Sequence, residues 1–124
     1  MRSLVLVDDT PHLLEELRDI FEMEGFTAIT CLSAADALRE ICQHTPDVII
    51  TDINMPGMSG FEFLDRLKED PAYQHIPVMV LSARADPQSA QEAFDRNADA
   101  YLTKPCDIGE LLDHVNKLCG NEAH

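Results

Sequence analysis

Short runs of Val, Ile and Leu recur along the chain and alternate with longer stretches whose apolar residues lie three or four positions apart. The short runs predict strands, and the longer stretches predict helices that each bury one face. The expected strands lie near 4–8, 27–31, 47–51, 77–81 and 99–102. The expected helices lie near 12–24, 34–43, 59–68, 87–96 and 107–118.

Five alternations of strand and helix predict an α/β fold with a parallel sheet covered by helices on both faces. The runs at 48–50 and 78–81 are almost wholly apolar, which is typical of central strands buried on both sides. Ser33 and Asp107 are good N-cap residues for the second and fifth helices, and Gly25 is a good terminator of the first. We expect one domain over 1–124, with a polar tail at 120–124 that is frayed or truncated.

Polar side chains follow the predicted strands where those strands end. They are Asp8, Asp9, Asp52, Ser82 and Lys104. In an open parallel sheet, ligands bind outside the carboxyl ends of the strands, so these residues form one candidate site. Three carboxylates at one edge repel each other, and a hard divalent cation such as Mg²⁺, which prefers oxygen ligands, relieves that repulsion.

Composition narrows the function further. The 124 residues carry a net charge of −14, which argues against direct binding of nucleic acid by this domain. No apolar stretch approaches the roughly 20 residues of a membrane span, and the first residues lack the pattern of a signal peptide. The cysteines show no metal-binding spacing, so we expect reduced thiols in a cytoplasmic protein. These cysteines are Cys31, Cys42, Cys106 and Cys119.

The motifs at the strand ends resemble the receiver domain of two-component response regulators, over nearly the whole chain. The matching segments are Val7-Asp8-Asp9, 52–60 (DINMPGMSG), Leu81-Ser82-Ala83 and 98–105 (ADAYLTKP). The resemblance implies a flavodoxin-like, doubly wound fold with five strands in the order 2-1-3-4-5.

The resemblance also implies the chemistry. Asp52 would accept a phosphoryl group from a phosphohistidine on a sensor histidine kinase or a histidine phosphotransfer protein. By the family pattern, Asp9, Asp52 and the backbone carbonyl of Asn54 would bind Mg²⁺ directly, and Asp8 would act through water. Asp52 as a turn cap and Asp8 as the N-cap of the first helix are the structural alternatives.

Three further residues have expected roles in a phosphorylation switch. Lys104 would neutralise the phosphoryl group, and it precedes Pro105, whose peptide bond is cis in the family. Ser82 would donate its hydroxyl to the phosphoryl group, and Tyr101 would turn inward as the fourth helix, fifth strand and fifth helix shift. An ordinary solvated lysine, a serine turn cap and a half-buried strand tyrosine are the alternatives.

The domain itself would be a switch, with self-catalysed phosphotransfer and slow autodephosphorylation. Its output would go to a downstream effector protein or a fused output domain. Three positions depart from the common family pattern or add to it. Asn97 replaces a common glycine and tolerates the left-handed conformation, Cys106 replaces a common phenylalanine, and Arg84 is a candidate guard of the phosphoryl group.

Two other functions compete with this interpretation. A haloacid-dehalogenase-like phosphatase would carry its nucleophile after the first strand and an acid–base Asp two positions later. Here Asp52 follows the third strand, and Asn54 cannot act as that acid or base. A phosphate-independent, receiver-like interaction module remains an alternative, because a complete site does not by itself establish use of that site.

Overall fold

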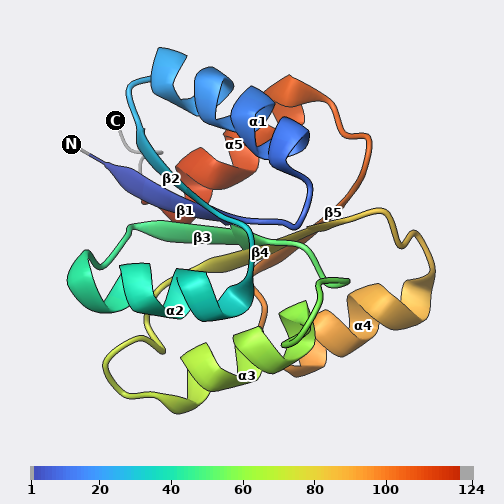
Figure 1. Ribbon diagram of the computed structural model, residues 1–124. Helices are drawn as coiled ribbons and strands as arrows, with labels where there is room; N and C mark the ends of the chain where they lie inside the picture. The colour runs from blue at the N-terminus through green and yellow to red at the C-terminus, as the bar shows by residue number, and fades with distance from the viewer. Residues whose placement is uncertain (1, 121–124) are drawn as a thin grey trace.

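The computed structural model describes residues 2–120, and it forms three layers with the sheet in the middle (Figure 1). Five parallel strands pair in the order β2-β1-β3-β4-β5, as predicted. They are β1 (Ser3–Val7), β2 (Thr27–Cys31), β3 (Val48–Thr51), β4 (Val78–Ser82) and β5 (Ala100–Thr103). Residues 121–124 of the predicted polar tail lie outside the described residues.

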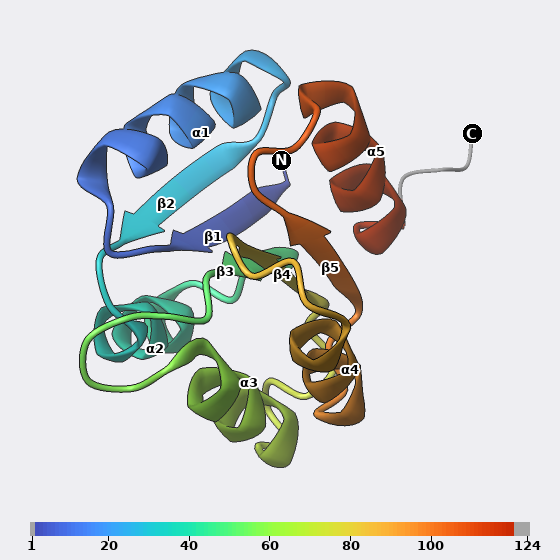
Figure 2. The same ribbon diagram turned by 90° about the vertical axis from the view of Figure 1, so that its right-hand side faces the viewer.

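Five helices cover the two faces of the sheet. They are α1 (Pro11–Met23), α2 (Ala34–Gln43), α3 (Gly60–Glu69), α4 (Pro87–Asp95) and α5 (Ile108–Leu118). Helices α1 and α5 lie on one face, and α2, α3 and α4 lie on the other (Figures 1 and 2). The predicted elements agree with these bounds to within about one residue at each end, a margin usual for element termini.

The hydrophobic core is divided by the sheet into two parts. On one side, Phe21 of α1 and Leu111 of α5 pack against strand residues such as Leu4. On the other, Phe63 of α3 and Ile41 of α2 pack against the opposite faces of β1, β3 and β4. Every residue of β3 and β4 is buried, as the continuous apolar runs predicted for central strands.

Local signals in the sequence account for most of the helix ends. The side chains of Ser33 and Asp107 accept backbone N–H bonds at the starts of α2 and α5, as expected. Gly25 follows the end of α1 with φ +93°, and Asn97 adopts φ 72° beyond α4. Among residues 2–120, no helix combines the length and the apolar character needed to cross a membrane.

Candidate functional site

Three carboxylates gather where β1 and β3 end. Asp8 and Asp9 directly follow β1, and Asp52 directly follows the neighbouring strand β3. One oxygen from each of the three lies within 4.8 Å of the others. The Asp8 side chain is buried, that of Asp52 is 12% exposed, and Asp9 faces solvent. Clustered, partly exposed carboxylate oxygens suit Mg²⁺, which takes oxygen ligands and retains waters.

Lys104 joins this cluster from the end of β5. Its Nζ lies 2.7 Å from Oδ2 of Asp8 and 3.3 Å from Oδ2 of Asp52. Burial opposes the charge of Lys104, but the hydrogen bond to Asp8 and the negative charges of Asp52 and Asp8 outweigh it and raise the lysine pKa. The alternative of an ordinary solvated lysine is therefore wrong. The peptide bond between Lys104 and Pro105 is cis.

The other oxygens of Asp8 and Asp52 are held by the backbone. Oδ1 of Asp8 accepts the N–H of Thr10 at 3.0 Å, and Oδ1 of Asp52 accepts the N–H of Ile53 at 2.7 Å. Thr10 is the N-cap residue of α1, so the alternative that Asp8 caps this helix is wrong. Both carboxylates are thereby oriented before any ligand binds.

Gly60 lets the start of α3 pack directly against the loop that carries Asp52. A Cβ atom at Gly60 would lie 2.0 Å from the backbone oxygen of Asp52. The Gly60 N–H donates to the carbonyl of Ile53 at 2.8 Å, and Ser59 and Glu62 form a capping box at the same helix end. The close approach of helix and loop therefore occurs at Gly60, where a side chain would not fit.

Ser82 and Tyr101 both lie beside the backbone of Arg84. Ser82 is buried at the last position of β4, and its Oγ accepts the N–H of Arg84 at 3.1 Å, as in a serine-stabilised turn. The Tyr101 hydroxyl donates to the carbonyl oxygen of Arg84 at 2.7 Å. Burial raises the pKa of Tyr101, so this hydroxyl remains a donor at neutral pH. One residue thus contacts both expected switch positions.

An open depression of about 510 Å³ adjoins the carboxylates and is lined in part by Asp9, Asn54, Phe61 and Arg84. The Arg84 guanidinium donates to Oδ1 of Asn54, so a cation lies at the rim of an acidic site. The sequence singled out Arg84, two residues after Ser82, as a candidate guard of the phosphoryl group. It contained no signal for the partners of Arg84, which come from other elements.

The comparisons with known proteins agree with this geometry. The family described as "Response regulator receiver domain" matches residues 4–116. The chain belongs to the response regulator receiver domain family. It is 39% identical to the transcriptional regulatory protein KdpE of Mycobacterium tuberculosis over 112 residues, which are 90% of this chain and 48% of that protein.

Two shorter relatives match over nearly their full length. The polar-differentiation response regulator DivK of Brucella ovis is 29% identical over 97% of this chain and 98% of that protein. The crystal structure of a response regulator from Chloroflexus aurantiacus superposes with a TM-score of 0.91 at 28% identity, covering 96% of this chain and 98% of that chain. The receiver therefore spans about half of KdpE but nearly all of DivK. Receiver domains are regarded as switches in two-component signalling.

Proposed function

We propose that this receiver accepts a phosphoryl group on Asp52 from the phosphohistidine of a sensor histidine kinase or a histidine phosphotransfer protein. The observation that carries the proposal is that Lys104 Nζ contacts Asp8 and Asp52 together, inside a cluster of three carboxylates. An ammonium beside the attacking carboxylate neutralises charge that develops on the transferred group.

The transfer is a displacement at phosphorus. A carboxylate oxygen of Asp52 forms the new O–P bond as the N–P bond of the phosphohistidine breaks, and the electron pair of that bond stays on the imidazole nitrogen. Lys104 then pairs with a phosphoryl oxygen. Asp9, Asp52 and the carbonyl of Asn54 would hold Mg²⁺ directly, with Asp8 acting through water, and the ion would supply further neutralisation of the phosphoryl oxygens.

Phosphorylation would then act as a switch. The new group adds a charge of about −1.5 to −2 near pH 7, by analogy with phosphate esters. The Ser82 hydroxyl, which now accepts the Arg84 N–H, would instead donate to the phosphoryl group. Tyr101 shares the Arg84 backbone, so this rearrangement would reach the face formed by α4, β5 and α5.

We further propose that residues 1–124 act as one receiver domain in the cytoplasm. Its output would pass to a separate effector protein or to a fused output domain. Both arrangements are consistent with the relatives, because the receiver covers 98% of DivK but only 48% of KdpE. Slow autodephosphorylation would reset it.

The test is the intact mass of the protein after incubation with acetyl phosphate, with and without Mg²⁺. We expect a Mg²⁺-dependent gain of one phosphoryl group in the wild type and in Asp113→Ala, which changes an exposed carboxylate on α5, and no gain in Asp52→Ala. A folded, Mg²⁺-supplied wild type that gains no mass from acetyl phosphate or from a phosphorylated kinase would instead favour a phosphate-independent interaction module.

A further inference from the structure

Phe61, at the start of α3, contacts two arginine side chains. The guanidinium carbon of Arg84 lies 6.0 Å from the ring centroid, and that of Arg96 lies 5.1 Å from it. A guanidinium within about 6 Å of an aromatic ring is attracted to the ring. Phe61 is 9% exposed and belongs to the core cluster of this face, so the core packs against part of the ring.

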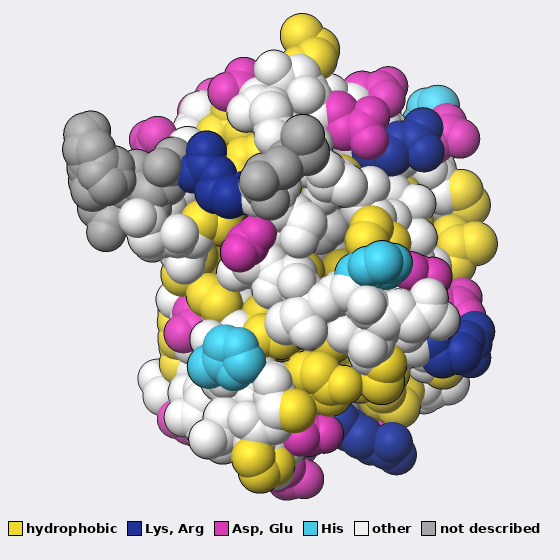
Figure 3. Space-filling view, turned by 90° about the vertical axis from the view of Figure 1, so that its left-hand side faces the viewer, with side chains coloured by type: hydrophobic (Ala, Val, Ile, Leu, Met, Phe, Trp, Pro, Cys, Tyr) yellow, Lys and Arg dark blue, Asp and Glu magenta, His cyan; other side chains and the backbone are white. Residues whose placement is uncertain are grey.

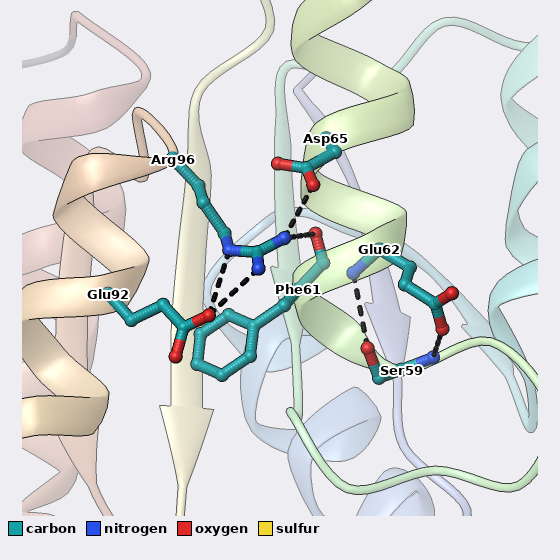
Figure 4. A network of polar contacts seen from close by, with 6 residues as sticks. All are labelled: Ser59, Phe61, Glu62, Asp65, Glu92 and Arg96. Atoms are coloured by element: carbon teal, nitrogen blue, oxygen red, sulfur yellow. Dashed lines mark hydrogen bonds and ion pairs between the residues drawn. The ribbon is translucent and has the colours of Figure 1, made fainter.

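Arg96 is held by several polar contacts (Figure 4). It follows α4 as the C-cap residue, and its guanidinium pairs with Asp65 of α3 and with Glu92 of α4. It also donates to the carbonyl oxygen of Phe61 at 3.4 Å. These contacts join the end of α4 to the first turns of α3 and hold one cation beside the ring.

Arg84, the second arginine beside the Phe61 ring, has fewer polar contacts than Arg96. Its guanidinium donates to the side-chain oxygen of Asn54, which is itself exposed, and otherwise lies by the Phe61 ring. Arg84 and Asp9 both line the open depression beside the carboxylates. The pKa of Asp86 is lowered by hydrogen bonds from Ser89 and also by the nearby charge of Arg84, but a long side chain whose hydrogen-bond partner is an exposed amide still has many rotamers open to it. The ring limits that freedom.

We propose that Phe61 and Arg96 are positioning residues that keep the Arg84 guanidinium at the mouth of the site, where it meets the phosphoryl group of an incoming donor. The inference rests on the proposed phosphotransfer. A guanidinium attracts phosphoryl oxygens and offsets the repulsion that a dianionic donor meets at three carboxylates. Arg96 acts at a distance, by fixing the ring on which Arg84 rests.

A double-mutant cycle tests the link between Phe61 and Arg84. The readout is the rate of phosphoryl uptake from acetyl phosphate, a small anion, at saturating Mg²⁺. Arg84→Gln should slow uptake about fivefold, and Phe61→Leu should slow it about threefold, because one favourable charge contact is lost or loosened. In the Arg84→Gln background, Phe61→Leu should have no further effect. An equal factor in both backgrounds would overturn the proposal, since independent sites add.

Matched variants separate positioning from general damage. Phe61→Tyr keeps the ring face and should restore wild-type uptake. Arg96→Gln should slow uptake about twofold, less than Phe61→Leu because the ring is retained, and only when Arg84 is present. Arg39→Gln, which breaks an exposed Arg–Asp pair within α2, should leave uptake unchanged. An equal loss in Arg39→Gln would assign the Arg96 effect to loss of charge alone and overturn its positioning role.

A second readout does not depend on phosphorylation. In the unphosphorylated protein, Arg96→Gln should shift the NMR signals of the Asn54 side-chain amide, because loosening the ring loosens Arg84, whereas Arg39→Gln should not. Unchanged Asn54 signals in Arg96→Gln would overturn the inference. If the wild type took up no phosphoryl group, the proposed function would fail and the Asn54 signals would still decide the positioning role.

Discussion

A largely buried lysine lies at each end of the parallel strands, one near the strand starts and one near the strand ends, and the surroundings of the two lysines differ. Lys68, 12% exposed in its side chain, lies where β4 and β5 begin; Lys104, 21% exposed, lies where β5 ends. Nζ of Lys68 contacts one carboxylate, Asp99, and two backbone carbonyls, those of Gln74 and Ile76. Nζ of Lys104 contacts Asp8 and Asp52, with Asp9 close by.

The strand starts and the strand ends differ in their balance of charge. At the strand starts, the ammonium of Lys68 faces one carboxylate, that of Asp99, which also accepts the Val78 N–H at 2.8 Å. The charges of these two side chains therefore balance each other. The surface at this end of the molecule shows acidic, basic and histidine side chains scattered among hydrophobic ones (Figure 3). At the strand ends, one ammonium faces three carboxylates. The first arrangement is complete as it stands, whereas the second leaves negative charge that a cation can neutralise.

The largest effect should come from removing the cation at the strand ends. Lys104→Met should reduce phosphoryl uptake by about 100-fold or more, because the charge that offsets the phosphoryl oxygens is lost. Uptake is measured from the intact mass after acetyl phosphate and Mg²⁺ are added. Lys117→Met, which removes an exposed lysine from α5, should leave uptake unchanged, and an equal loss in both variants would contradict a role specific to Lys104.

Removing the lysine at the strand starts should instead destabilise the fold. Lys68→Met removes the ammonium donor from two carbonyls and from Asp99, which keeps the Val78 N–H, and we expect the free energy of unfolding to fall by about 1–2 kcal/mol. Urea unfolding measures this change, with Lys117→Met as the control. Phosphoryl uptake by the folded variant should stay within about twofold of the wild type. A large loss of uptake with unchanged stability would contradict this prediction, because Lys68 would then serve phosphoryl uptake and not the stability of the fold.

A smaller effect should follow from removing one carboxylate of the unbalanced cluster. Asp8→Asn keeps the shape of the side chain but removes one negative charge, and Mg²⁺ affinity should fall about tenfold, as for a ligand acting through water. Calorimetric titration with MgCl₂ measures the affinity. Asp113→Asn removes an exposed carboxylate from α5 and should have little effect. Equal changes in both variants would assign the effect to net charge rather than to the site.

The smallest effect should be seen in the alkaline range. The pKa of Lys104 is raised in the folded protein above its ordinary value of 10.5, so its stabilisation is complete below that value. The stabilisation is then lost as the pH rises through the folded pKa. As the pH rises above 10.5, the wild type should lose more stability than Lys104→Met. Parallel unfolding curves across this range would show that Lys104 gains nothing from its two carboxylates.

Much of the architecture was predictable from local patterns. Apolar runs bounded by polar residues located each strand, and capping residues such as Ser33 and Asp107 located helix starts, because both signals act over a few residues. The boundaries differed slightly at Asp8, which follows β1, and at Ser82, which ends β4. The strand order came from the resemblance to receiver domains rather than from these patterns.

The candidate site was predictable in its membership but not in its contacts. The sequence placed Asp8, Asp52 and Lys104 at strand ends, and the rule for parallel sheets placed those ends at one edge. It did not indicate which oxygen meets Nζ of Lys104, nor that the N-cap of α1 is Thr10 rather than Asp8. Those details depend on loop paths that short-range patterns leave open.

The sequence by itself determined the elements, the residues that end them and the excess of negative charge. The tertiary structure alone decided which distant side chains meet: Lys104 lies 96 positions from Asp8, and Phe61 collects arginines from two other segments. The physical reason is the distance along the sequence over which each effect acts. Backbone conformation and burial follow from neighbouring residues, whereas a contact between two side chains requires the whole sheet to bring their strands together.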